Sequence, residues 1–287
     1  MDLFAVTPVS YMRSRETSPK VEYTRMPRTS LHVLIVTGIA LVLAVLAQAQ
    51  SGNQRPREPA SYAREAGGEF EFVRLAYSSN RYARSGWYRQ AWQTDYPDAE
   101  HHFLKGVSRL TRISAAEDGI VMTALDEDIY DYPWIYAVEV GMWYLSDQEA
   151  ARLRDYLLRG GFLMVDDFHG PTEWYLFVSS MEKVFPDRPI VDIPDDDEAF
   201  HVIYDLDKRI QIPSRQYTFT GVTWEKGGYT PRWRGIYDDD GRLMVSINFN
   251  MDIGDAWEHA DWPDYPENMT ALAYRFGINY LIYAMTH

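Results

Sequence analysis

Hydrophobic and polar positions follow two different periods along the chain from residue 69 onward. Short apolar runs typical of buried strands occupy residues 70–76, 120–124, 134–140, 162–165 and 243–249. Apolar residues at a spacing of three or four predict helices at residues 98–112, 146–159, 171–184 and 269–285. Because strands and helices take turns in this order, the pattern predicts an α/β fold with a largely parallel sheet flanked by helices.

Local signals mark where several of these elements begin and end. Ser146 and Glu149 are spaced as a capping box, in which each side chain satisfies a free amide at a helix start. Gly160 suits the left-handed turn that ends such a helix, and Pro171 suits the first position of the next one. Asp238–Gly241 favours a hairpin turn before the strand at 243–249.

The first 68 residues differ from the rest of the chain. Residues 31–47 are an uninterrupted apolar run that follows Arg25 and Arg28 and ends in Ala47-Gln48-Ala49. This order is typical of a secretory signal peptide over residues 1–49, and an uncleaved N-terminal anchor is the alternative. Residues 50–68 are polar and predict a flexible linker, so the folded domain covers residues 69–287. We therefore expect a secreted or periplasmic protein that meets a membrane only through an uncleaved N-terminal segment.

Composition narrows the classes of partner and of chemistry. The chain has no cysteine, which excludes disulfides and thiol catalysis. Beyond residue 49, 23 Lys and Arg face 39 Asp and Glu, a net charge of −16. Such a surface repels phosphate backbones, so we expect no nucleic-acid partner. Aromatic residues make up 15% of the chain, which indicates a packed core and not a disordered acidic protein.

Three segments carry a resemblance to a known family: 133–167 (PWIYAVEVGMWYLSDQEAARLRDYLLRGGFLMVDD), 241–258 (GRLMVSINFNMDIGDAWE) and 276–286 (FGINYLIYAMT). Together they resemble a bacterial family, domain of unknown function 4159. That family is similar in turn to class I glutamine amidotransferase-like and trehalose-utilisation-type domains. The resemblance implies a flavodoxin-like three-layer sandwich, but it assigns no activity.

Acidic residues follow two of the predicted strands. In amidotransferases the turn after such a strand presents a cysteine, whereas here it holds Asp166, Asp167 and His169. A second loop, with Asp252 and Asp255, follows the strand at 243–249. Adjacent strand residues point to opposite faces, so only one of Asp166 and Asp167 can enter a given pocket. Ligand sites of open α/β sheets gather beyond the carboxyl ends of the strands, so the two loops are expected to meet.

Two interpretations of these acidic loops remain open. Asp167, His169 and Asp252 would serve as acid/base groups, or as ligands of a divalent cation, with Asp255 beside them as a ligand-binding residue. No other cofactor is expected. The structural alternative is that an aspartate caps the following helix and that His169 fills a turn. The neighbours His101 and His102 diverge by about a quarter turn on their helix, so we interpret them as surface residues.

A cluster of aromatic and arginine residues follows the first strand. Its candidate ligand-binding residues are Arg81, Trp87, Tyr88 and Trp92. Flat rings beside hydrogen-bonding side chains suit a sugar, and the alternative is that the rings pack a long loop onto the domain. Four further aromatic residues lie close to predicted strands and are predicted to be part of the hydrophobic core: Trp134, Tyr136, Trp143 and Tyr144.

Two classes of function fit these features. The first is an exported amidotransferase-like domain that lacks the cysteine nucleophile and acts as a binding or assembly module of the cell envelope, with a glycan or a protein as partner. The second is a carboxylate- or metal-dependent hydrolase of a glycan-like substrate. Glycosidase chemistry would need two carboxyl groups about 5 to 10 Å apart.

Overall fold

The computed structural model describes residues 68–80 and 90–287. The predicted signal peptide or anchor, and the predicted linker up to residue 67, lie outside the described residues. In the part that is described, no helix is long and apolar enough to cross a membrane.

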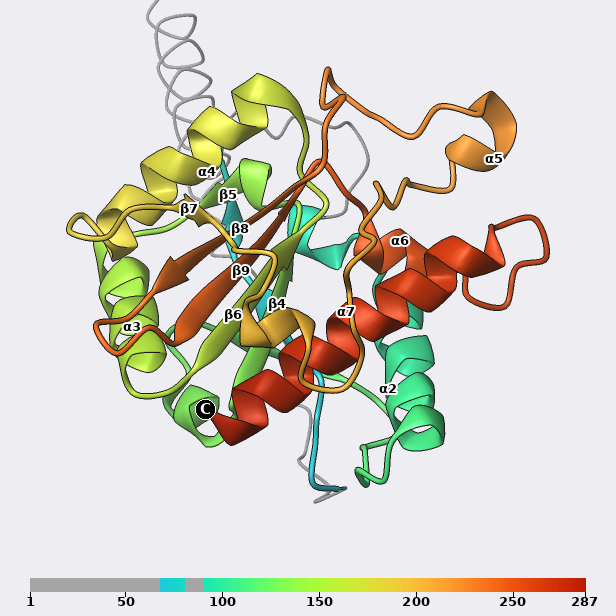
Figure 1. Cartoon of the computed structure of the whole chain (residues 1–287). Coiled ribbons are helices and arrows are strands. Elements are labelled where there is room, and N and C mark those ends of the chain that lie inside the picture. The colour runs from blue at the N-terminus through green and yellow to red at the C-terminus, as the bar shows by residue number, and fades with distance from the viewer. Residues whose placement is uncertain (1–67, 81–89) are drawn as a thin grey trace, which may run out of the picture. The chain divides into compact units, whose positions relative to one another are not determined.

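A seven-stranded sheet forms the centre of the domain (Figure 1). Its strand order is β3-β1-β4-β6-β9-β8-β7. The strands β3, β1, β4, β6 and β9 run parallel, whereas β8 and β7 are antiparallel to their neighbours. Their bounds are β1 (Val73–Ala76), β3 (Ile120–Thr123), β4 (Trp134–Val138), β6 (Phe162–Asp166), β7 (Val191–Asp192), β8 (Arg232–Tyr237) and β9 (Leu243–Phe249). The predicted α/β fold with a largely parallel sheet is confirmed.

The helices and short elements connect these strands. The α-helices are α2 (Asp98–Leu110), α3 (Asp147–Leu158), α4 (Gly170–Val184), α5 (Tyr217–Thr220), α6 (Ile253–Glu258) and α7 (Glu267–Thr286). Single 3-10 turns are η1 (Ala91–Gln93), η2 (Glu127–Asp131), η3 (Val140–Met142) and η4 (Glu198–Phe200). A separate two-stranded ribbon pairs β2 (Ser78–Ser79) with β5 (Trp143–Tyr144).

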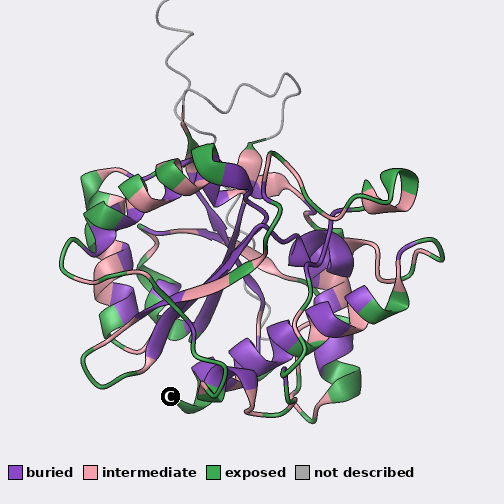
Figure 2. Cartoon of the chain, turned by 45° about the horizontal axis from the view of Figure 1, so that its top comes forward, coloured by how far each residue is buried: buried purple, intermediate pink, exposed green. Residues whose placement is uncertain are grey.

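Helices cover both faces of the sheet. On one face Trp134 stacks on Phe103 of α2, and Tyr136 contacts Trp257 of α6. This core also contains the apolar side chains of α7. On the other face Ile135 and Leu163 share a core with α3 and α4. Successive strand residues point to opposite faces, which is why an unbroken apolar strand feeds two cores. Figure 2 shows the central strands buried between these layers.

The predicted capping box and glycine turn bound α3 as expected, whereas α4 begins one residue before Pro171 and α2 ends at Leu110. The Glu149 amide donates to Ser146 Oγ (3.2 Å) and the Ser146 amide donates to Glu149 Oε2 (2.8 Å), which confirms the capping box. Gly160 has a φ of 108°, a conformation that L side chains rarely adopt, so a glycine is needed there. The hairpin between β8 and β9 is closed by a hydrogen bond from Asp238 N to Arg242 O.

One core assignment is wrong. Tyr144 is 53% exposed, whereas its neighbour Trp143 is 2% exposed and stacks on Phe177. The two residues form the short strand β5, where adjacent side chains point in opposite directions. The ribbon therefore buries the ring of Trp143 and exposes the ring of Tyr144, although the sequence alone did not distinguish these two aromatic residues.

Candidate functional site

Three neighbouring parallel strands end in polar residues with left-handed backbone. Glu139 follows β4 with a φ of 51°, Asp167 follows β6 with 49°, and Asn250 follows β9 with 63°. Positive φ is uncommon outside glycine, and such conformations cluster at functional sites. Asp95 and Lys226 complete the set of non-glycine residues with positive φ in the described ranges. All five lie around the carboxyl edge of the sheet.

Asp166, the last residue of β6, has a structural role at this edge. Its Oδ2 atom accepts hydrogen bonds from the amides of Ile253 (2.6 Å) and Gly254 (2.9 Å) at the start of α6. A carboxylate in this place satisfies free amides and favours the positive end of the helix dipole. The helix that an aspartate caps is therefore α6, which is distant in sequence, and not α4, which follows Asp166 directly.

Asp167, which follows β6 with left-handed backbone, meets two other carboxylates. Oxygen atoms of Asp95, Asp167 and Asp252 all lie within 4.8 Å of one another. Asp95 precedes α2, Asp167 follows β6, and Asp252 follows β9. Their residues are only 6%, 6% and 4% exposed. The expected meeting of the two acidic loops is thus seen, and Asp95 joins them from a third segment.

The surroundings of this carboxylate cluster fix its geometry. Arg74 of β1 donates to the backbone oxygens of Trp92 (3.1 Å) and Thr94 (2.8 Å), which holds the segment that leads to Asp95. Asp252 Oδ1 accepts from the amide of Asp255 (2.8 Å) and so also caps α6. Asp95 Oδ2 is buried and has no hydrogen-bond partner among the described residues.

Burial and mutual repulsion disturb the ionisation of this cluster. Burial, together with the charge of Asp255 and others, raises the pKa of Asp167 to about 8. Burial and neighbouring carboxylates raise the pKa values of Asp95 and Asp252 well above the ordinary range. Within the described ranges, none of the three forms an ion pair with a lysine or an arginine. The cluster therefore holds protons, or it needs a cation from outside.

The nearest lysine is already engaged by other acids. Lys226 Nζ lies 2.8 Å from Glu173 Oε1 and 3.6 Å from Glu139 Oε2. Burial acts to lower the pKa of Lys226, but the charges of Glu139, Glu173 and Asp167 outweigh it and raise the pKa. Glu173 Oε2 also accepts the amide of His169 (2.6 Å). This network ties the turn after β6 to the loop that carries Lys226.

The remaining residues that the sequence predicted for the site lie around the carboxylate cluster or outside the described residues. His169 Nε2 lies 3.0 Å from Asp167 Oδ1, so the histidine contacts one member of the cluster instead of joining it as a third ligand. Asp255 lies on α6, where its Oδ2 accepts the Arg215 amide (2.7 Å). Trp92 is 8% exposed and its ring nitrogen donates to Gln90, which favours the packing interpretation. Arg81, Trp87 and Tyr88 lie outside the described residues.

Sequence reasoning missed Asp95. It lies in an irregular segment between η1 and α2, where no strand end marks it as a site residue. The available signal was a single aspartate shortly before a predicted helix, which is also typical of an ordinary helix start. Its position became informative only once Arg74 was seen to hold that segment against the sheet.

The fold and the site define a class: an α/β domain with a mostly parallel sheet, helices on both faces and buried carboxylates at the carboxyl edge. The chain belongs to the family described as Domain of unknown function (DUF4159), whose profile matches residues 71–285. The family that the three sequence segments resemble is therefore confirmed. No curated protein matches the chain.

Proposed function

We propose that this protein is an exported, divalent-cation-binding domain that acts as a binding or assembly module of the cell envelope. The observation that carries the proposal is the convergence of Asp95, Asp167 and Asp252, whose oxygen atoms lie within 4.8 Å of one another while their side chains are buried. Within residues 68–80 and 90–287 no lysine or arginine pairs with these three buried carboxylates, so they are costly to keep ionised. A cation between them removes that cost.

The donor atoms favour a hard cation. All three groups offer carboxylate oxygens, which suit Mg²⁺, Mn²⁺ or Ca²⁺ better than softer ions. Asp95 Oδ2 has no hydrogen-bond partner among the described residues, which supports a cation site, because a buried acceptor without a donor is a natural position for a metal ligand. The bound ion would link the loops after β6 and β9 to the segment before α2 and so organise the edge on which a partner binds.

Export, the amidotransferase-like fold and the glycan ligand are proposed from the sequence. The apolar run at residues 31–47 supports export, and the absence of cysteine excludes thiol amidotransfer. We further propose that the fold is of the amidotransferase-like, flavodoxin-like kind, since Asp167 occupies the strand-to-helix turn where such proteins present a nucleophile. A glycan that stacks on Trp87 and Tyr88, beside Arg81, is the ligand we expect if the partner is not a protein.

A hydrolase is the second candidate, and one observation favours it. Asp167 has a φ of 49° between β6 and α4, which resembles the strained elbow that exposes a nucleophile, and His169 lies beside it. The burial of Asp167 opposes this candidate, because a nucleophile must reach its substrate. Turnover of a glycoside that is lost in Asp167→Asn but independent of added cation would favour the hydrolase over the cation-binding module.

Calorimetric titration of the chelator-treated protein tests the cation site. We expect Mg²⁺, Mn²⁺ or Ca²⁺ to bind the wild-type chain, and Asp252→Asn to weaken that binding at least about 100-fold, since an ordering partner alone is worth 10- to 100-fold. Asparagine retains the helix cap that Asp252 provides. The exposed Asp207→Asn is the matched control and should bind as wild type.

The same titration also measures the protons that the carboxylate cluster releases when a cation binds. Because burial and neighbouring acids raise the pKa values of Asp95, Asp167 and Asp252, cation binding should release protons from this cluster. The measured heat should therefore depend on the ionisation enthalpy of the buffer. Absence of binding by all three cations, or equal loss of binding in Asp207→Asn, would contradict the proposed function.

Gly254 provides a steric test of the same cluster. A Cβ atom at this position would clash with Asp95 Oδ2 and would lie 2.7 Å from the Tyr136 hydroxyl oxygen, so Gly254→Ala must displace the carboxylate and the hydroxyl. We expect a loss of stability of about 1 to 3 kcal/mol from overpacking and about tenfold weaker cation binding, measured by urea unfolding and calorimetry. Gly106→Ala, whose Cβ would meet the Tyr274 ring at 2.2 Å, is overpacked elsewhere and should lose stability only. Equal loss of affinity in both variants would show that general stability, and not Asp95, controls binding.

A further inference from the structure

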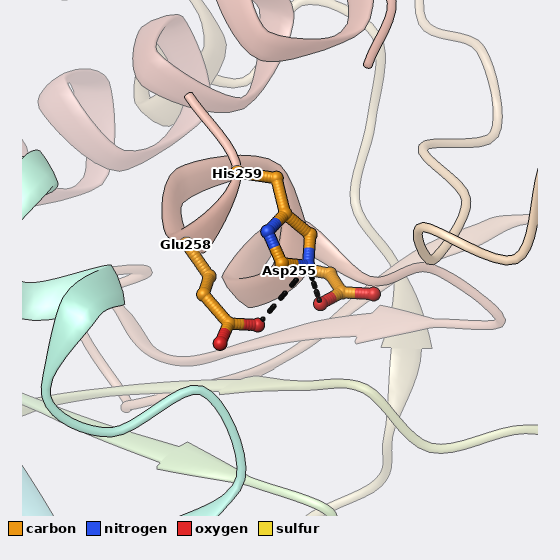
Figure 3. A group of neighbouring side chains, drawn as sticks. All are labelled: Asp255, Glu258 and His259. Carbon is orange, nitrogen blue, oxygen red and sulfur yellow. Dashed lines mark ion pairs between the residues drawn. The ribbon is translucent and has the colours of Figure 1, made fainter. Parts of the chain in front are cut away.

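A second group of side chains that could hold a metal ion comes from α6 and from the residue that follows it. Asp255, Glu258 and His259 are spaced i, i+3 and i+4, which places them on one face of the helix (Figure 3). One ligand atom from each lies within 4.8 Å of the other two. Unlike the cluster of Asp95, Asp167 and Asp252, this group includes an imidazole and is partly exposed.

The side chains of this group are joined by ion pairs, and the separations of their ligand atoms also match those around a metal ion. His259 Nε2 lies 3.3 Å from Asp255 Oδ1 and 3.3 Å from Glu258 Oε2. Hydrogen bonds between charged groups are shorter, about 2.7 to 2.9 Å. Ligands about 2.0 to 2.1 Å from a tetrahedral zinc ion are about 3.3 to 3.4 Å apart. His259 Nε2 is buried and has no well-formed hydrogen bond among the described residues.

The surrounding contacts orient these ligands. Asp255 uses its second oxygen, Oδ2, to accept the Arg215 amide at 2.7 Å, which fixes the carboxylate. The His259 ring packs edge-on against Trp262, with ring centroids 5.0 Å apart. Trp257 is fully buried against Phe103, so α6 itself is anchored in the core. Such outer contacts are what hold metal ligands in position.

A second histidine faces the same cavity from α2. The cavity has a volume of about 400 Å³ and is lined by Asp98, His102, Glu258, His259, Asp261, Trp262 and Pro263. His102 Nδ1 lies 2.9 Å from Trp257 O and 3.0 Å from Glu258 O. Carbonyl oxygens only accept, so Nδ1 carries the proton and Nε2 is free to act as a ligand in the neutral ring. The nearest acid, Asp261 Oδ2, is 3.9 Å from Nε2, beyond hydrogen-bonding distance.

We propose that Asp255, Glu258 and His259 bind a zinc ion whose remaining position opens into the cavity lined by His102 and Asp261. Three protein ligands with an open fourth position allow the ion to hold a water molecule or a small oxygen ligand. His102 lines the same cavity, where its Nε2 atom can receive a hydrogen bond from that molecule. This site does not depend on a cation at Asp95, Asp167 and Asp252.

Zinc titration in a background that lacks the other site tests the proposal. The Asp252→Asn protein, treated with a chelator, is titrated with ZnCl₂ and, in parallel, with CoCl₂. We expect one equivalent of zinc to bind, and Co²⁺ to show the visible absorption of tetrahedral coordination. Adding His259→Gln should weaken zinc binding at least about 100-fold, more than loss of an outer partner causes.

Two further variants make the outcome decisive. His101→Gln is the matched control, because His101 is on the same helix as His102 but does not line the cavity, and it should leave zinc binding unchanged. Glu258→Gln, with a partly exposed side chain, tests the site without the ring packing of His259 and should also weaken binding. No zinc binding, binding that survives both ligand variants, or equal loss in His101→Gln would overturn the site. Loss of Mg²⁺ or Ca²⁺ binding elsewhere would not affect it.

Discussion

Adding Mg²⁺, Mn²⁺ or Ca²⁺ to the chelator-treated protein is expected to raise its melting temperature by about 5 to 10 °C. A ligand that binds only the folded state, present at 100 times its dissociation constant, stabilises the fold by about 2.7 kcal/mol. For a domain of 150 to 250 residues, each kcal/mol shifts the melting temperature by about 2 to 4 °C. The cation would act on Asp95, Asp167 and Asp252, which the fold holds together at a cost.

The same measurement on Asp252→Asn should show little or no shift, because the variant removes one of three ligand charges and keeps the cap of α6. Asp207→Asn should behave as wild type. The shift should be measured by calorimetry at two protein concentrations, so that an effect of association can be separated from binding. A cation-induced shift of equal size in Asp252→Asn would place the bound ion elsewhere on the acidic surface.

Without a cation, Asp167→Asn is expected to stabilise the protein at pH 8, by about 1 to 3 kcal/mol. The wild-type carboxylate is buried, close to Asp95 and Asp252, and not paired with a lysine or an arginine in the described residues. A neutral amide of the same shape removes that repulsion. Asparagine also tolerates the left-handed backbone of this position, where φ is 49°.

The pH dependence of this effect has a defined sign. Burial and neighbouring acids raise the pKa of Asp167 from 3.8 to about 8, so the folded state binds the proton more tightly than the unfolded chain. The stability that the protonated carboxyl contributes is fully present below about pH 4 and is lost as the pH rises to about 8. Burial and then the charge of Asp167 raise the pKa of Asp166 to about 8, so Asp166 adds to the same fall in the wild type and adds less in the variant. The gain from Asp167→Asn should therefore be absent near pH 4 and largest at pH 8.

Urea unfolding between pH 4 and pH 8, with and without Mn²⁺, checks this prediction. The order of stability should reverse at pH 8: the variant is more stable without the cation, and the wild type is more stable with it. Functional sites commonly lower the stability of the folded protein, because their residues are selected for binding and not for stability. If Asp167→Asn is less stable than wild type at every pH, the carboxylate has a structural role, for instance with His169.

Much of the fold was predictable, because its signals are local. The strand at 243–249 was predicted with the bounds of β9, since an apolar run between turn residues needs no distant information. The helix at 98–112 matches α2 apart from its last two residues. By contrast, β7 and β8 were not predicted. Neither strand carries a buried apolar run: β7 has only two residues, both exposed, and only two positions of β8 are buried. Their place in the sheet depends on the pairing of β8 with β9 and of β7 with β8.

The candidate site was predictable in part. Acidic residues directly after two apolar strands indicated that Asp167 and Asp252 would share an edge, because parallel strands end on the same side of a sheet. Whether the strands are neighbours could not be read from the order of the chain. β6 and β9 lie side by side although almost 80 residues separate them, and the segment between them forms the antiparallel edge and the loop of Lys226.

The sequence by itself determined the α/β alternation, the helix caps, the absence of thiol chemistry and the acidic residues at the strand ends. Only the tertiary structure decided the roles of Asp166 and Asp167, which are adjacent and chemically identical. Asp166 caps α6, whereas Asp167 faces Asp95 and Asp252. The reason is physical: periodicity and capping act between residues a few positions apart, whereas the burial, charge and partners of a carboxylate depend on segments that meet only when the chain is folded.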